Sequence, residues 1–163
     1  MIGLRLSVLN LNSPYKIWND NNGYHFITDN GIAYVVEFDF YDIPISDEAY
    51  WFNLYNLSGK DSPHDVKLQK TIVCIVEEFF RQNPHILLYM CDTAENQQAA
   101  RSRLFLRWFN LYGHKDEFIM RSAVVRDEDM DNSITLIVQK SNPKAAEILA
   151  TFDEQIGMFK ENK

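Results

Sequence analysis

Apolar and polar residues alternate along two stretches in the first third of the chain, and this period of two predicts β-strands. In the stretch 32–41, large apolar side chains occupy every second position, and acidic residues stand between some of them. The apolar face of that stretch consists of Tyr34, Val36, Phe38 and Phe40. Residues 49–57 alternate in the same way, and residues 24–28 form a shorter strand. Because the Asp-Asn-Gly turn at 29–31 tolerates positive φ, these strands are expected to form an antiparallel meander.

Helical spacing takes over after residue 64 and predicts three helices. They are expected over about 65–82, over about 94–112 and from Asn142 toward the end of the chain. Each begins at a residue whose side chain can accept from free backbone N–H groups, namely Asp65, Asp92 and Asn142. The last helix carries an apolar stripe, so it is expected to dock on the sheet. That stripe consists of Ala145, Leu149, Phe152, Ile156 and Phe159.

A short apolar run, His85–Cys91 (HILLYMC), lies between the first two predicted helices. A continuous apolar run of this length fits a central strand that is buried on both faces. Residues 118–126 and 133–140 are two further strands, joined by a hairpin with an acidic tip at 127–132.

The resulting order is β-β-β-α-β-α-β-β-α, so the expected fold class is α+β, a mostly antiparallel twisted sheet with helices packed on it. The helix between the third and fourth strands allows that pair to run parallel. The length fits a single domain, 1–163. Residues 1–23 are expected to give one weak strand or a weakly ordered arm.

Composition narrows the class of protein. Hydrophobic residues make up 46% of the chain, enough for a packed core, and the net charge is −7. A chain without a basic excess is not expected to bind nucleic acids in general, because phosphate neutralisation drives that affinity. Two cysteines make no disulfide framework, and no apolar run approaches a membrane span. These features predict a cytoplasmic protein without a membrane segment.

The densest positive cluster lies on the second predicted helix, at Arg101, Arg103 and Arg107. Arg103 and Arg107 share a helix face, and arginine is the preferred partner of phosphate and carboxylate groups. The cluster is therefore a candidate site for an anion or a partner protein. The alternative is pairing with the chain's own acidic residues, as on most solvated faces.

The second candidate is a calcium-binding loop, but the sequence matches only the first part of that pattern. Asp127, Asp129 and Asp131 have the spacing that begins such a loop. Asn132 and Val138 stand where the loop needs glycine and glutamate, so a solvated hairpin tip is expected instead.

The third candidate is Cys91, at the end of the buried strand. A nucleophilic cysteine needs a histidine base, but His64, His85 and His114 lie in no recognisable catalytic signature. The alternative is a buried thiol beside the capping Asp92. The sequence contains no phosphate-binding glycine loop and no zinc spacing, so no cofactor or metal is predicted.

Three aromatic residues, Tyr41, Trp51 and Tyr55, fall on the face of the meander opposite its main core. If the last helix covers them, they are core residues, and its apolar stripe favours that arrangement. If it does not, they form an exposed aromatic patch that marks an interaction surface.

Two motifs carry a resemblance to other proteins. Y-x-F-x-T-D begins at Tyr24, and A-R-x-R-L-F-x-R-W-F runs from Ala100 to Phe109. With Cys91-Asp92 between them, they resemble a family of uncharacterised bacterial proteins of about this length. The resemblance spans roughly residues 15–155 and implies a cytoplasmic bacterial protein with no assigned activity.

The order of elements is similar to the central part of the GCN5-related acetyltransferase fold, and Asn96-x-x-Ala99 matches the N-x-x-A that opens a helix there. In that fold, a Gly-rich turn after the meander holds the pyrophosphate of acetyl-coenzyme A on its backbone N–H groups. In the corresponding turn here, Pro63 has no N–H, and Asp61 and Asp65 repel phosphate. The resemblance implies an acetyltransferase-like fold with a degenerate cofactor site.

The sequence therefore leaves two functions open. One is a non-enzymatic binding or interaction module, with a protein partner or as a homodimer. The other is an acetyltransferase-like protein, active or degenerate. A splayed gap beside the strand 85–91, with a pocket in it, is the structural feature that bears most directly on the choice.

Overall fold

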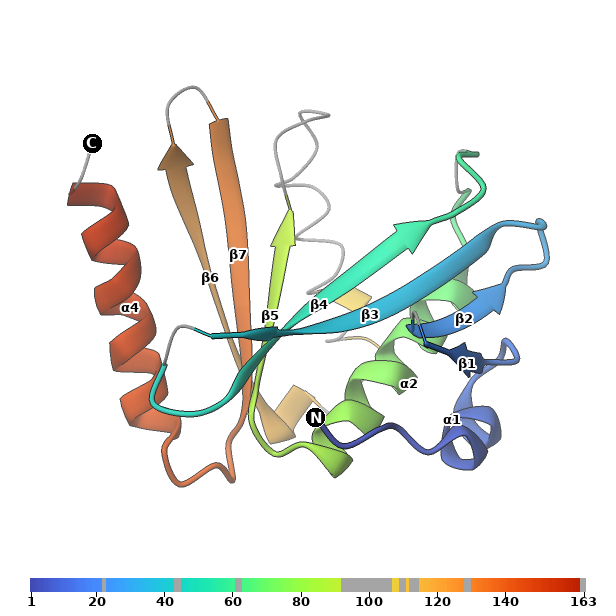
Figure 1. Ribbon diagram of the computed structural model, residues 1–163, viewed down its shortest axis with the longest axis horizontal. Coiled ribbons are helices and arrows are strands. Elements are labelled where there is room, and N and C mark those ends of the chain that lie inside the picture. Colours follow the sequence, from blue (N-terminus) through green and yellow to red (C-terminus); the bar gives the residue numbers. More distant parts are fainter. Residues whose placement is uncertain are drawn as a thin grey trace.

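The computed structural model describes residues 1–21, 23–42, 45–60, 63–91, 107–108, 111, 115–127 and 130–161. In these residues, seven strands form one sheet in the order β1-β2-β3-β4-β5-β7-β6 (Figure 1). The strands are β1 (Trp18–Asp20), β2 (Gly23–Ile27), β3 (Ala33–Tyr41), β4 (Ala49–Asn56), β5 (Ile86–Cys91), β6 (Phe118–Asp127) and β7 (Met130–Gln139). The helices are α1 (Leu6–Asn12), α2 (Val66–Gln82) and α4 (Ala145–Glu161), with a 3₁₀ turn η1 at Lys115–Glu117.

The strand pairing confirms the predicted α+β class. β2, β3 and β4 form the expected antiparallel meander, with Tyr24 opposite Val36. α2 connects β4 to β5, and these two strands run parallel. β5 pairs antiparallel with β7, and β7 with β6. The sheet is thus mostly antiparallel, as expected.

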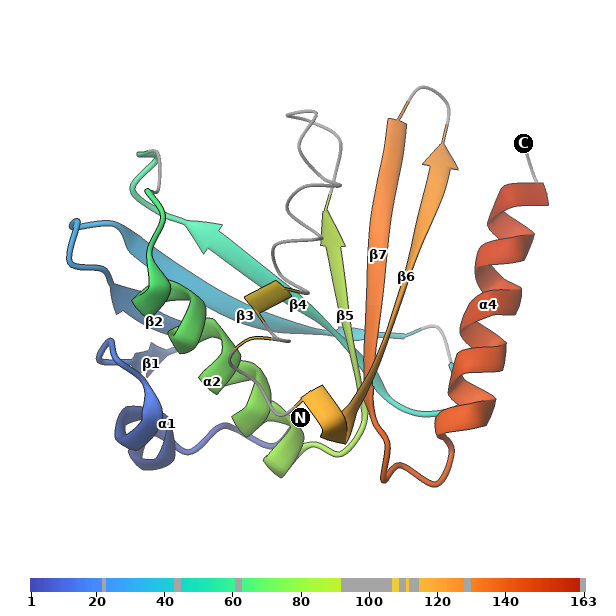
Figure 2. The same cartoon turned by 180° about the vertical axis from the view of Figure 1, so that it is seen from behind.

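Apolar side chains cover the sheet on opposite faces at its two ends. α1 and α2 lie on one face, over the strands of the meander (Figure 2). The largest fully buried side chains of that cluster include Phe26, Phe52, Phe79, Phe80 and Ile72. α4 supplies Ile148 and Phe152 to a second cluster with Ile86, Leu88 and Val138 of β5 and β7. The last helix therefore docks on the sheet, as its apolar stripe predicts.

The predicted helix caps are confirmed at two sites. The Asp65 Oδ1 atom accepts from the backbone N–H of Leu68 at 3.1 Å. The Asn142 Oδ1 atom accepts from the backbone N–H of Lys144 at 2.9 Å, just before α4 begins. Both bonds satisfy a backbone donor that the helix itself leaves unpaired.

The prediction of one weak strand or a weakly ordered arm for residues 1–23 was right only in that the segment contains one short strand. The segment contains α1 and β1, and Leu4, Leu9, Tyr15 and Ile17 are buried in the larger core cluster. Burial against α2, rather than local propensity, decides the structure there.

Hydrogen bonds to side chains hold the segment before α1 against α2. Asn83 bonds both backbone groups of Ile2, donating to its carbonyl oxygen at 2.9 Å and accepting from its N–H at 2.7 Å. Glu78 accepts from the backbone N–H of Arg5 at 3.0 Å and from two nitrogens of the Arg5 guanidinium, at 3.0 and 3.2 Å. The tyrosine hydroxyl of Tyr24 accepts from the N–H of Leu4. The chain start is therefore built into the fold.

Three further expectations needed correction. Phe40 follows the alternation of β3 but is 60% exposed, because it lies beyond the fully buried part of the core on that face. Met90 of β5 is also exposed, so the run His85–Cys91 is central but is buried on both faces only at Ile86–Leu88. The hairpin after β6 is tighter than expected, since Asp127 lies opposite Met130.

We expect Gly23→Ala to lower the free energy of unfolding by about 2 kcal/mol. Gly23 opens β2 with a φ of +134°, and a Cβ there would meet the backbone carbonyl oxygen of Val36. Gly31→Ala is the matched control, since its φ of +74° is also positive but nothing lies near its Cβ position. It should cost about 1 kcal/mol. Urea unfolding measures both, and equal losses would contradict the close approach.

Candidate functional site

The parallel strands β4 and β5 separate along their length, and this opening is the candidate site. They pair over only four positions, from Ala49 opposite Ile86 to Phe52 opposite Tyr89. β4 continues to Asn56 in register with β3, whereas β5 continues to Cys91 in register with β7. The ends of β4 and β5 therefore diverge, as Figure 1 shows. The divergence is one half of the feature expected from the sequence, a splayed gap with a pocket in it, whereas the larger cavity found in the described residues lies elsewhere, beside β1 and β3.

The edge of β4 presents backbone hydrogen-bonding groups to the opening. The N–H of Leu57 donates to the carbonyl oxygen of Ala33 at 2.8 Å, so odd-numbered residues of β4 bond to β3. The backbone N–H and C=O groups of even-numbered residues point toward β5 instead. Accordingly, the carbonyl oxygen of Glu48 accepts from the N–H of Ile86. Beyond Phe52, the N–H and C=O of Leu54 therefore face the opening without a strand partner among the described residues.

The face of the opening on the α2 side is aromatic. The rings of Phe52 and Tyr89 lie 5.9 Å apart across the start of the divergence. Leu54, Tyr89 and Trp108 are partly buried against the same core cluster. The opening therefore combines apolar side chains with a polar strand edge, as ligand sites commonly do.

The start of α2 is not available to an anion. Asp65 caps the helix, and the hydroxyl of Tyr15 donates to the second oxygen of that carboxylate at 2.7 Å. Lys67 pairs with Asp29 at 2.8 Å. Burial raises the pKa of Tyr15 and the N–H of Asp29 opposes this, but Asp65 adds to the rise, so Tyr15 stays a hydrogen-bond donor. The protein's own carboxylate occupies the place where a phosphate would bind.

Cys74, the thiol whose side chain the structure describes, is not activated as a nucleophile. Burial raises the pKa of Cys74 to about 11, and the nearby Glu77 adds to the rise, so this thiol stays protonated at neutral pH. Cys91 ends β5, and its side chain lies outside the described residues. His85 precedes β5, about 20 Å of strand away from Cys91, and its Nδ1 lies 3.0 Å from Asp47.

Arg101 and Arg103, two of the three candidate anion-binding arginines, lie outside the described residues. Arg107 is helical and exposed, next to Trp108, which packs on the core. The predicted helix 94–112 is thus described only at residues 107, 108 and 111, all of them helical.

The aromatic residues opposite the main core divide into two groups. Tyr41 and Trp51 contact each other, with ring centroids 5.4 Å apart, and pack against the α4 cluster. Tyr55, near the end of β4, is 46% exposed. The last helix therefore covers the start of β4 and leaves its end uncovered.

Sequence reasoning missed a cavity of about 340 Å³ at the other side of the meander. It lies where the β1–β2 hairpin ends beside β3, and Asp20, Glu37 and Asp39 line it with Asn19 and Asn21. The signal was present, because Glu37 and Asp39 share the polar face of β3, but only strand pairing brings Asp20 beside them.

The part of the chain that the structure describes has no cluster of three or more His, Cys, Asp or Glu side chains able to hold a metal ion. No helix within it has both the length and the apolar character needed to cross a membrane.

A family-level sequence comparison matches residues 64–154 to a family of unknown function, DUF6169. The match runs from the loop before α2 into α4 and includes β5, one side of the opening. Searches of curated proteins and of solved structures found no match. Because the family match covers more than half of the 163 residues, the chain belongs to the DUF6169 family of unknown function.

Proposed function

We propose that this protein is a binding module that takes an extended, amide-bearing ligand in the opening between β4 and β5. The observation that carries the proposal is the backbone edge at Leu54, which has no strand partner among the described residues, beside the aromatic pair Phe52 and Tyr89. An extended ligand can bond to a free strand edge as an added strand does, while apolar side chains hold the rest of it.

The ligand class that fits best is an acyl-pantetheine, the reactive arm of acetyl-coenzyme A. This arm is an extended chain that carries amide groups, so it matches the strand edge. The resemblance to acetyltransferases in the order of elements favours the same ligand, and the divergence of β4 from β5 adds support. The capped start of α2 leaves no room for the pyrophosphate there, so the pantetheine arm supplies the binding energy.

The proposal is for binding without turnover. Cys74 is protonated at neutral pH, and His85 bonds to Asp47 at the opposite end of β5 from the opening. The arginine cluster Arg101, Arg103 and Arg107 remains the candidate for binding a phosphate, and such a contact would be sensitive to salt. We further propose a single-domain, bacterial, cytoplasmic protein that does not bind nucleic acids in general, in line with its composition.

We expect acetyl-coenzyme A and S-acetylpantetheine to raise the melting temperature to a similar extent, because both carry the arm that fits the opening. In ¹⁵N NMR spectra, the amide signals of Leu54 and Asn56 should shift on titration, while that of Gly31 stays unchanged. Adenosine 3′,5′-bisphosphate, which lacks the arm, is the matched control and should move neither signal.

Three results would count against the proposal. No melting shift at millimolar acetyl-coenzyme A would remove the ligand class. Binding of the bisphosphate alone, lost in an Arg103→Ala, Arg107→Ala double variant, would move the site to the arginines. Release of free coenzyme A that one polar point mutation abolishes would show that the protein is an enzyme.

A further inference from the structure

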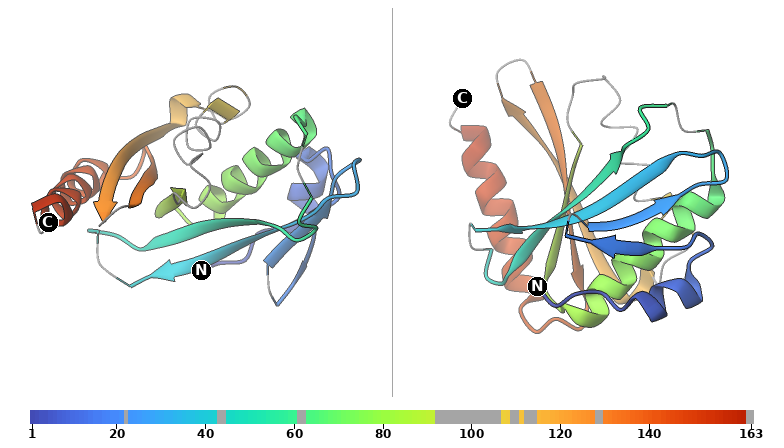
Figure 3. Two further views of the ribbon diagram at one scale, coloured as in Figure 1. Left: turned by 90° about the horizontal axis from the view of Figure 1, so that it is seen from above. Right: turned by 45° about the vertical axis from the view of Figure 1, so that its right-hand side comes forward.

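One face of the meander has no helix over it among the residues that the structure describes. α1 and α2 lie on the far side of β1, β2 and β3, and α4 covers only the start of β4 (Figure 3). We call the uncovered face the open sheet face and define it by Trp18, Ile27, Tyr55 and Leu57, together with the acidic residues Asp20, Glu37 and Asp39.

Strand register places these residues in rows. Trp18 lies opposite His25, His25 opposite Val35, and Val35 opposite Tyr55, so one row crosses four strands. Directly opposite residues in an antiparallel sheet point to the same face, so the row forms one surface. The Trp18 and His25 ring centroids lie 5.7 Å apart, and the two rings are stacked. Val35, in the same row, is buried.

The next row makes the surface continuous and apolar. Ile27 lies opposite Ala33, and Leu57 bonds to Ala33 from the other side. The side chains of Trp18, Ile27, Tyr55 and Leu57 are between 41% and 57% exposed. Four adjacent large side chains this exposed differ from the scattered apolar residues of an ordinary surface and mark a contact surface.

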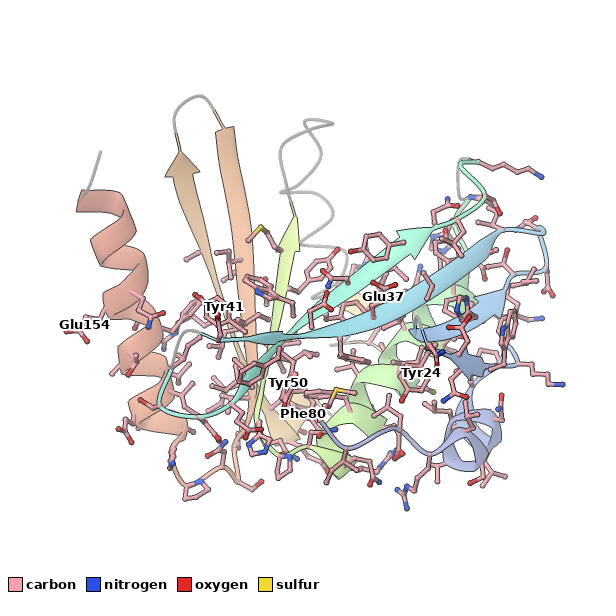
Figure 4. The ribbon with its side chains drawn as sticks, in the orientation of Figure 1. Tyr24, Glu37, Tyr41, Tyr50, Phe80 and Glu154 are labelled. Atoms are coloured by element: carbon pink, nitrogen blue, oxygen red, sulfur yellow. The ribbon has the colours of Figure 1, made fainter. Side chains whose placement is uncertain are left out.

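The rows on the other side of Trp18 and Tyr55 are acidic. Asp20 lies opposite Gly23, and Glu37 lies opposite Asn53. Asp39 follows one row further, held by the Asn53 side chain at 2.7 Å. Glu37 is labelled in Figure 4, midway along β3. The three carboxylates line the cavity of about 340 Å³, which is large enough for a small ligand or a long cationic side chain.

From this juxtaposition we infer that the open sheet face binds a partner protein through a segment that is both apolar and basic. Its apolar side chains pack on Trp18, Tyr55 and Leu57, and a lysine or arginine enters the cavity beside Glu37 and Asp39, since Asp20 already pairs with the His25 Nε2 atom at 2.9 Å. Charge selects this occupant over a second copy, because two chains of net charge −7 that meet through acidic rows repel each other. The same carboxylates exclude nucleic acids and anionic membranes.

A fluorescein-labelled peptide in which isoleucine and lysine alternate tests the inference by anisotropy. One matched peptide has glutamate in place of every lysine, and another has serine in place of every isoleucine. We expect the first peptide to bind at least about tenfold more tightly than either. Tyr55→Ser should weaken its binding about tenfold. Glu37→Gln with Asp39→Asn should weaken it several-fold and flatten its salt dependence.

Phe40→Ser is the matched control, because Phe40 is also an exposed aromatic residue but lies on the opposite face of the sheet, and this variant should bind the peptide as the wild type does. Circular dichroism checks that each variant is folded. Equal binding of the acidic peptide, or no effect of Tyr55→Ser, would overturn the inference. So would a wild-type dimer in sedimentation that Tyr55→Ser dissociates, since the occupant would then be a second copy.

Discussion

Phe79→Ala is expected to lower the free energy of unfolding by about 4 kcal/mol, because it empties the centre of the larger core cluster. Phe79 is fully buried on α2. Its ring stacks on Phe38 at 5.0 Å and meets the edges of Tyr50 and Phe80 at 5.8 and 5.2 Å. The large-to-small change removes these contacts and leaves a cavity that three rigid rings cannot refill. Urea unfolding at constant pH measures the loss.

Phe40→Ala is the control for the loss of a phenylalanine as such. Phe40 lies on the same face of β3 as Phe38 but is 60% exposed, so its removal should change stability by less than about 0.5 kcal/mol. A loss at Phe79 no larger than that at Phe40 would contradict the position of α2 against the meander.

The contrast between these two residues shows where sequence periodicity stops being informative. Alternation correctly placed Tyr34, Val36, Phe38 and Phe40 on one face of β3. It could not say that α2 covers only part of that face, because the extent of cover depends on the position of a helix far along the chain. Met90 of β5 is exposed for the same kind of reason.

Order and pairing of the elements were more predictable than their extent. The β-β-β-α-β arrangement and the parallel pair β4–β5 follow from the helical connection between strands. The opening between these two strands could not be predicted in this way, because it arises from the pairing of each strand with its other neighbour. β4 stays with β3 over its whole length and β5 stays with β7, so a twisted sheet must part where the two halves diverge.

The two surfaces for which binding is proposed share a physical basis. Each lies where strand pairing or helix cover ends before the strands do, at Leu54 in the opening and at Tyr55 on the open sheet face. The two residues are adjacent in β4 but serve different surfaces. The backbone groups of Leu54 face the opening, whereas the ring of Tyr55 faces solvent.

The segment before α1 was the least predictable part of the fold, and Glu78 is the residue that the sequence conceals. In the sequence it is one of two adjacent glutamates on an amphipathic helix. In the structure its side chain is fully buried and accepts three bonds from Arg5. Burial would raise the pKa of Glu78, but the bonds and charge of Arg5 outweigh it, so the pKa lies below its ordinary value of 4.5.

We expect Glu78→Ala to lower the free energy of unfolding by about 3 kcal/mol at neutral pH. The change leaves the Arg5 backbone N–H without its acceptor and releases the segment before α1 from α2. Glu154→Ala is the matched control, since Glu154 lies exposed on α4 and points away from the sheet (Figure 4). It should change stability by less than about 0.5 kcal/mol.

Glu78→Ala should also change how the stability of the fold depends on pH, which a loss of packing alone would not do. Because the folded pKa of Glu78 is depressed, its charged form stabilises the fold fully above the ordinary value of 4.5 that the unfolded chain has. That contribution disappears as the pH falls through the folded pKa, where the carboxylate takes up a proton. The stability difference between wild type and Glu78→Ala should therefore be constant from pH 7 down to about pH 5 and shrink below about pH 4. Urea unfolding across this range measures it, and a difference that stays constant into acid would show that Arg5 does not hold Glu78 in its charged form.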